Sequence, residues 1–266
     1  QSLAMWSFSA GSIARYDEAN ETMNRCIALH ERHGDMIGVA VALQNRGVTS
    51  FLTGNVERFF ADIERVVEIA REYGFAMCEC AAVRDLAEVS FVLGRTDEAL
   101  PHARRALEMY TQQFGTASRM VYAVDVLVAR ITAYHGDEAA AEAIIRRVLA
   151  AQAEARAAGR TELLLNDDER VLLDALDSFL RREGDAKFDA LAARGRELQL
   201  QPQDVVEVLE WKGLSALRAG RAEAGMTFLA DALAAADKTI ASGRVQRRIA
   251  RARAEATAPR RAGHAS

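Results

Sequence analysis

Glycines recur along this chain at intervals of about 20 residues, and this spacing is the feature that most limits the folds open to it. The stretches between them carry apolar side chains three and four positions apart, which is the spacing of one helix face. Because glycine readily adopts the left-handed backbone that ends many helices, each one marks a helix end. The series stands at positions 34, 54, 74, 94, 115, 136, 159, 184, 220 and 243. Two helices make a unit of about 40 residues, and a fixed period of this size indicates a helical repeat array.

The composition supports helix almost throughout. Half of the 266 residues are hydrophobic, only 3 are proline, and aromatic residues make up 6%. Few prolines interrupt helices, and the apolar content is enough for an extended core. We therefore predict an all-α fold, an α-solenoid of about six antiparallel helix pairs without a β-sheet.

The units align on the turn between their two helices. The turn segments are 14–19, 54–59, 94–99, 136–141 and 220–225. Seven residues before each turn stands a small residue: Ser7, Gly47, Ala87, Ala129 and Gly213. Twelve residues after the start of each turn stands another compact residue: Cys26, Val66, Ala106, Val148 and Ala232. Small side chains at fixed offsets let antiparallel helices pack closely, so we expect these positions in the core.

The fifth unit is irregular, because 48 residues separate Gly136 from Gly184. A one-residue slip of the register replaces polar residues at its core positions with Leu176, Phe188 and Gly195. The extra residues fall near 159–168, where Thr161 or Asn166 can cap the next helix, and Glu169 stands at the capping-box spacing from Asn166. We predict one long helix from about 161 to 182.

The turn sequences and small-residue positions over residues 3–240 resemble the tetratricopeptide repeat. This resemblance implies a right-handed superhelical array in which the first helix of each pair lines a concave groove. The chain departs from the family in its longer period and in lacking the closing proline, which a glycine after an aromatic residue or histidine replaces. The longer period is similar to that of helical arrays in bacterial multidomain signalling proteins, such as ATPase-linked transcription activators and serine/threonine kinases.

The predicted organisation is one repeat array followed by a basic end. The repeats span approximately 1–34, 35–74, 75–115, 116–159, 160–200 and 201–243, and a capping helix with a flexible tail covers 244–266. Because the chain begins with Gln1 inside a helical pattern, we expect it to be part of a longer protein. The first helix is rich in large apolar groups, and we expect them to meet a preceding repeat or a second copy: Leu3, Met5, Trp6, Phe8 and Ile13.

The resemblance places a set of polar and aromatic residues on the concave groove, where we expect a partner to bind. They are Gln44, Asn45, Arg84, Asp85, Glu88, Arg130, Tyr134, Trp211 and Arg218. The guanidinium groups of Arg84 and Arg130 offer forked donors for a carboxylate or phosphate, although Arg84 and Glu88 can also pair along one helix. The carboxylate-clamping subtype of the family has Lys and Asn where this chain has Ala4 and Phe8, which argues against a chaperone tail as the partner.

The motifs of catalytic and metal sites are missing from the sequence. It contains neither a Gly-x-Ser-x-Gly nucleophile motif, nor a phosphate-binding loop, nor His-Glu-x-x-His. Cys26, His30 and His33 share one helix face, but Cys26 holds a core position and a fourth ligand is missing. Cys78 and Cys80 point apart on a helix. We predict that the chain is not an enzyme and has neither a metal site nor a cofactor.

The charge is uneven along the chain. Residues 241–266 hold seven arginines and one acid, for a charge of +6, so that the total of −4 leaves −10 on residues 1–240. A basic arm can bind nucleic acid, but this one has no aromatic residue for base stacking. Arg244, Arg247, Arg248 and Arg251 have helical spacing. We therefore favour a hydrated capping helix over a nucleic-acid arm.

The three cysteines lack the spacing of a disulfide framework, and the sequence shows neither a signal peptide nor an apolar run long enough to cross a membrane. These features predict a cytoplasmic location without a membrane partner. The sequence favours a non-catalytic interaction, scaffold or sensor module of a larger bacterial signalling or regulatory protein, binding a peptide or protein through the groove. The alternative is a small-molecule effector sensor domain of a transcription regulator or kinase, which would need a closed pocket.

Overall fold

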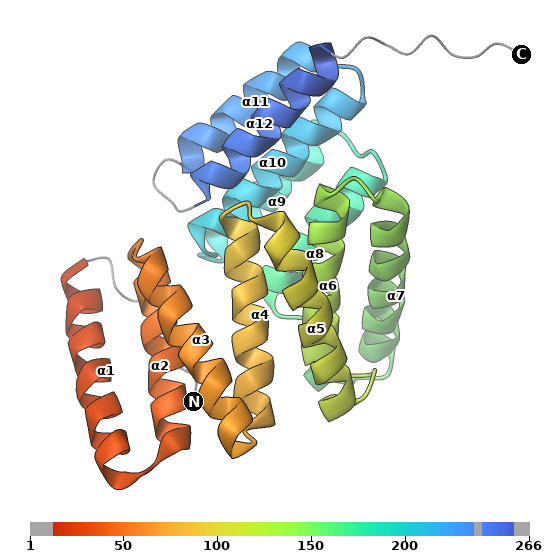
Figure 1. Ribbon diagram of the computed structural model, residues 1–266. Coiled ribbons are helices and arrows are strands. Elements are labelled where there is room, and N and C mark those ends of the chain that lie inside the picture. Colours follow the sequence, from red (N-terminus) through yellow and green to blue (C-terminus); the bar gives the residue numbers. More distant parts are fainter. Residues whose placement is uncertain (1–12, 237–240, 258–266) are drawn as a thin grey trace, which may run out of the picture. The chain divides into compact units, whose positions relative to one another are not determined.

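The computed structural model describes residues 13–236 and 241–257, and Figure 1 shows that they form helices joined by short connections. These residues contain twelve α-helices and one short 3-10 turn, without a β-strand. The helices pack in consecutive pairs, which confirms the predicted all-α, solenoid-like array. The residues Leu3, Met5, Trp6 and Phe8, which we expect to meet a neighbour, lie outside the described residues, as does the predicted tail after residue 257.

The chain divides into two compact units, each of which is described by itself. The first unit comprises Gln1–Val89 and Glu98–Gly115, and the second comprises Ser90–Asp97 and Thr116–Ser266. The first unit holds α1 (Ile13–His33), α2 (Met36–Leu52), α3 (Val56–Tyr73) and most of α4 (Ala76–Val92) and α5 (Thr96–Phe114). Within it, α2 packs against both α1 and α3.

The second unit is built around α10. It holds α6 (Arg119–Tyr134), α7 (Glu138–Ala157), α8 (Asp167–Leu180), α9 (Asp185–Glu197), α10 (Pro202–Arg218), α11 (Ala222–Ala236) and α12 (Ser242–Thr257). Helix α10 packs against α8, α9 and α11. The rings of Trp211 and Phe179 lie 4.8 Å apart in an apolar core to which α6, α7, α8, α9 and α10 contribute.

The small-residue positions lie where the predicted register puts them. A Cβ atom on Gly47 would lie 3.2 Å from the Ile63 side chain, and one on Gly213 would lie 2.7 Å from Leu229. Helix pairs α2/α3 and α10/α11 are therefore in close contact at these glycines. The other described members of the two series are buried, except for Cys26, which is half-buried. The prediction of close packing at these offsets is thus confirmed, outside Ser7, which is not among the described residues.

Most of the predicted glycine turns are confirmed. Gly74 ends α3 in the left-handed conformation with φ 73°, a backbone that favours glycine. Eight glycines of the series have positive φ, at positions 34, 54, 74, 94, 115, 136, 159 and 220. At Gly184 the predicted break between helices is present, but Gly184 precedes α9 with φ −78° and lacks the left-handed backbone. The turn prediction at Gly243 is wrong, because Gly243 lies inside α12. Arg182 and Gln199 have positive φ at the left-handed positions that follow α8 and α9.

The predicted turn at 14–19 is also wrong, because α1 already begins at Ile13. The predicted long helix from residue 161 is wrong as well, since Thr161–Leu163 form a 3-10 turn and α8 begins at Asp167. The buried side chain of Gln152 stabilises this non-helical segment: its Nε2 donates to the carbonyl of Leu163 (3.0 Å), and its Oε1 accepts from the amide of Leu165 (2.9 Å). The Asn166 capping box and the buried Leu176, Phe188 and Gly195 of the slipped register are confirmed.

Candidate binding surfaces

An apolar stripe runs along one face of α2 in the first unit. Ile37, Val41 and Val48 are 50%, 47% and 37% exposed. Positions four and eleven residues apart fall within about 40° of one another around a helix, so these side chains form one line. Large exposed apolar side chains grouped in this way are typical of contact surfaces rather than of an ordinary solvated helix face.

Gln44 lies on the same face of α2 as this stripe and is bonded to a polar residue of α4. The side-chain amide of Gln44 donates to Oδ2 of Asp85 (2.8 Å), and Nη2 of Arg84 lies 2.7 Å from Oδ1 of the same carboxylate. Attraction to Asp85 raises the pKa of Arg84 above its ordinary value, and Glu88 adds to this attraction. Three of the predicted groove residues thus meet in one hydrogen-bonded group. Two further predicted groove residues, Asn45 and Glu88, are half-buried.

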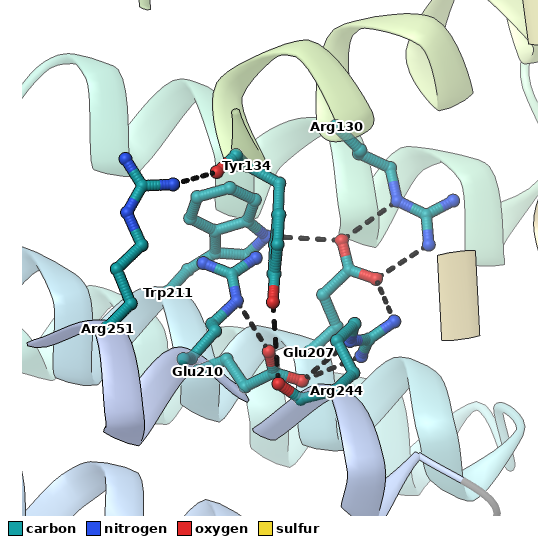
Figure 2. A network of polar contacts seen from close by, with 8 residues as sticks. Arg130, Tyr134, Glu207, Glu210, Trp211, Arg244 and Arg251 are labelled. Atoms are coloured by element: carbon teal, nitrogen blue, oxygen red, sulfur yellow. Dashed lines mark hydrogen bonds and ion pairs between the residues drawn. The ribbon is translucent and has the colours of Figure 1, made fainter. Parts of the chain in front are cut away.

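The second unit holds a buried cluster of charged side chains, shown in Figure 2. Two carboxylates come from α10, Glu207 and Glu210, and both are fully buried. Three arginines face them: Arg130 from α6, and Arg244 and Arg248 from α12. Charged groups are buried at this depth only when they are paired. This group of five is called the buried ion cluster below.

Glu207 is held by groups from three helices. Arg130 forms a two-pronged contact with it, from Nε to Oε1 (2.9 Å) and from Nη2 to Oε2 (2.7 Å). The indole of Trp211, one turn along α10, donates to Oε1 (3.2 Å). Nη1 of Arg244 lies 3.3 Å from Oε2. Burial by itself would raise the pKa of Glu207, but attraction to Arg130 and Arg244 outweighs it and lowers the pKa to about 2.

Glu210 binds the arginines of α12. Nε and Nη2 of Arg244 both donate to its Oε1, at 2.9 and 2.7 Å. Nε of Arg248 lies 2.7 Å from its other oxygen, Oε2. Helix α12 is therefore joined to α10 by ion pairs that are shielded from water, where they act far more strongly than at the surface.

Aromatic rings complete the cluster. The guanidinium carbon of Arg248 lies 4.1 Å from the centre of the Tyr134 ring and 4.3 Å from that of Trp211. Arg244 lies 4.9 Å from the centre of the Phe91 ring. A cation over an aromatic face is stabilised by the negative potential of the ring, so these rings suit guanidinium groups.

The charges within the cluster do not balance. Its three arginines and two glutamates leave one positive charge in excess. Nη2 of Arg248 is buried and has no hydrogen-bond partner among the described residues. Burial lowers the pKa of Arg248 below its ordinary value in spite of the attraction of Glu210. Arg248 is therefore the least well satisfied member of the cluster.

The structure brings three of the predicted groove residues, Arg130, Tyr134 and Trp211, to this one place. Arg130 and Trp211 are buried, however, so they do not line an open groove. The predicted groove residue Arg218 lies elsewhere, over the ring of Phe179 at 5.1 Å and in an ion pair with Glu138. Sequence reasoning missed Glu207 and Glu210. The prediction that the α12 arginines are hydrated is wrong for Arg244 and Arg248.

Arginine does not exchange protons near neutral pH, so the three guanidinium groups of the buried ion cluster act as fixed positive charges. His30, singled out with Cys26 and His33, lies 2.8 Å from the carboxylate of Asp35. Across residues 13–236 and 241–257, no group of three or more His, Cys, Asp or Glu side chains is arranged to hold a metal ion. Nor does any helix in these ranges combine the length and apolarity of a membrane span.

Comparison with protein-family models and with curated proteins found no match. The resemblance to the tetratricopeptide repeat therefore stays a prediction.

Proposed function

We propose that this chain is a non-catalytic interaction module, part of a cytoplasmic regulatory protein of the bacterial type, that binds a peptide or protein partner through the exposed face of α2. The observation that carries the proposal is the apolar stripe of Ile37, Val41 and Val48. The first helices of tetratricopeptide-like pairs line the binding groove in the family that the sequence resembles, and α2 is such a helix.

The flanking polar residues support the same function. Interfaces combine an apolar centre with a hydrogen-bonding rim, and the group of Gln44, Asp85 and Arg84 provides a rim beside the stripe. These side chains are already held by one another, so they are ordered before a partner binds. Little conformational entropy is then lost on binding.

A site-specific photocrosslinker tests the proposal. The full chain carrying the crosslinking residue at position 41 should capture a defined partner, whereas the same residue at Glu64, an exposed polar position on α3, should not. A substitution completes the test. Adding Val48→Glu to the chain that carries the crosslinker at position 41 should reduce capture at least about tenfold, because a charge replaces an apolar contact. Equal capture at positions 41 and 64, or capture unaffected by Val48→Glu, contradicts the proposal.

A further inference from the structure

The second unit contains a face that already binds a helix. It comprises Arg130 and Tyr134 of α6 and Glu207, Glu210 and Trp211 of α10, and is called the arginine-recognition site below. We infer that this site recognises a helix bearing arginines four residues apart, that α12 is its occupant in this chain, and that a separate helix of the same pattern can replace α12. This inference concerns the second unit and is independent of the role proposed for α2.

Helix α12 contacts the site through arginine side chains on one face. Arg244 and Arg248 enter the buried ion cluster. Arg247 donates from Nη1 to the carbonyl of Gly94 (2.9 Å), and Arg251 donates from Nη1 to the carbonyl of Tyr134 (3.0 Å). These four arginines follow the spacing i, i+3, i+4 and i+7 of a single helix face, which is a pattern that any helix can present.

The site without α12 is complementary to a cation. Its two glutamates and the single Arg130 leave one negative charge, and the rings of Tyr134 and Trp211 receive a guanidinium between them. One arginine is enough to neutralise this charge. Helix α12 supplies two, Arg244 and Arg248, which turns the balance to one positive charge.

The excess charge weakens the docking of α12. Burying a charge without full pairing costs free energy, and so does a buried N–H group without an acceptor, such as Nη2 of Arg248. The docked α12 is therefore held less firmly than its number of ion pairs suggests. It keeps the site because it belongs to the same chain, which places it there at an effective concentration on the order of millimolar.

The contacts of Arg244 and Arg248 define the pattern that the site recognises, a helix with arginines at positions i and i+4. Val245 directly follows Arg244, Ile249 directly follows Arg248, and both apolar side chains are buried. Apolar residues at i+1 and i+5 therefore belong to the same pattern. An acidic residue on this face would meet Glu207 and Glu210 and be repelled. The site therefore selects basic amphipathic helices and rejects acidic ones.

The probe for the test is a fluorescein-labelled peptide of residues 242–257, the α12 sequence itself. Its binding is measured by fluorescence anisotropy against full-length chains. In the chain carrying Arg244→Gln and Arg248→Gln the site lacks its occupant, and the peptide should bind at least about tenfold more tightly than to the unsubstituted chain. Adding Glu207→Gln and Glu210→Gln to that chain should abolish binding.

Two control peptides establish the pattern. A peptide with Arg244→Gln and Arg248→Gln should not bind, whereas a peptide with Gln246→Ala should bind as the parent does, because position 246 is exposed and faces away from position 244. Absence of binding to the arginine-substituted chain, or equal binding of the two control peptides, overturns the inference.

If the arginine-substituted chain does not fold, hydrogen exchange of the unsubstituted chain tests the inference instead. The amides of α12 should exchange faster than those of α10, and millimolar peptide should accelerate exchange in α12 while leaving α10 protected. Exchange of α12 and α10 at one common rate that the peptide does not change would overturn the inference. The exchange of α2 is expected to stay constant throughout, so this result cannot be confused with a failure of the role proposed for α2.

Discussion

Helices α2 and α10 are both first helices of a pair, but α2 exposes apolar side chains whereas α10 buries charged ones. In the first unit, α2 exposes an apolar line of Ile37, Val41 and Val48 to solvent. In the second unit, α10 buries the carboxylates of Glu207 and Glu210 completely. The difference comes from what is packed beside each helix, since the arginines of α12 lie over α10 and pair with its carboxylates.

The comparison shows that residue type does not decide which face of a repeat is open. A glutamate is buried when arginine and aromatic groups replace its water, and a valine stays exposed when none of the described helices of its own unit covers it. We therefore propose partner binding for α2, whereas α10 binds a helix of its own chain. Each of the following predictions tests one side of this contrast.

The largest effect is expected for Glu207→Gln. The substitution leaves Arg130 and Arg244 buried without their shared carboxylate, and breaking a buried ion pair in this way typically costs about 3–5 kcal/mol. Urea unfolding followed by circular dichroism measures the loss of unfolding free energy. The control is Glu223→Gln, an exposed glutamate in the first turn of α11, which should change stability by less than about 0.5 kcal/mol. Similar losses of unfolding free energy in the two variants would contradict the claim that Glu207 is a buried, paired carboxylate.

The pH dependence of stability tests the burial of charge in the second unit at a separate carboxylate. Burial raises the pKa of Asp125 in α6 to about 6, although Arg147 partly counteracts it. The folded chain therefore holds this proton more tightly than the unfolded chain does. The stabilising contribution of Asp125 is then present at low pH and is lost as the pH rises from about 4 to about 6, by about 3 kcal/mol in total.

The variant Asp125→Asn isolates this contribution. Urea unfolding of the variant and the parent chain between pH 4 and pH 7 should show the variant gaining about 3 kcal/mol relative to the parent as the pH rises. A constant difference between the two chains across this range would show that Asp125 titrates normally.

Packing at the helix-pair glycines should also differ between the units. Gly213→Ala places a methyl group 2.7 Å from Leu229 and should cost about 1–3 kcal/mol by overpacking. Gly47→Ala meets Ile63 at 3.2 Å, and the higher helix propensity of alanine, worth about 1 kcal/mol, offsets this milder contact. Thermal unfolding of both variants measures the difference, and a larger loss for Gly47→Ala would reverse the expected order.

The smallest effect on stability is expected on the open face. Val41→Gln changes a half-exposed side chain and should alter the unfolding free energy by less than about 0.5 kcal/mol. Its effect should appear instead as loss of partner capture. A loss of stability of more than about 1 kcal/mol would mean that this side of α2 is internal core.

The repeat architecture was predictable from sequence because it depends on local chemistry. Left-handed glycines such as Gly74 and close contacts such as that at Gly213 are set by residues near them in the chain. The fifth unit could not be predicted fully, since the side chain of Gln152 determines the backbone of residues 163–165 from another helix. Arg182 fills a left-handed position that its residue type does not favour.

The buried ion cluster was predictable only in part. The helical spacing of Arg244 and Arg248 was visible, and the resemblance placed Arg130, Tyr134 and Trp211 on one face. Glu207 and Glu210, however, look like ordinary surface glutamates of an amphipathic helix. The partner of Glu207 is 77 residues away along the chain, and sequence patterns do not specify a pairing at such a distance.

The coupling energy between Glu210 and Arg244 tests the central claim most directly. It is obtained from the unfolding free energies of Glu210→Gln, Arg244→Gln and the double variant, and compared with the same cycle for Arg65 and Glu68, an exposed pair on α3. The account predicts more than about 1.5 kcal/mol for the buried pair and at most about 0.5 kcal/mol for the exposed pair. A coupling energy for Glu210 and Arg244 as small as that of the exposed pair would contradict the claim that the arginines of α12 fill the face of α10.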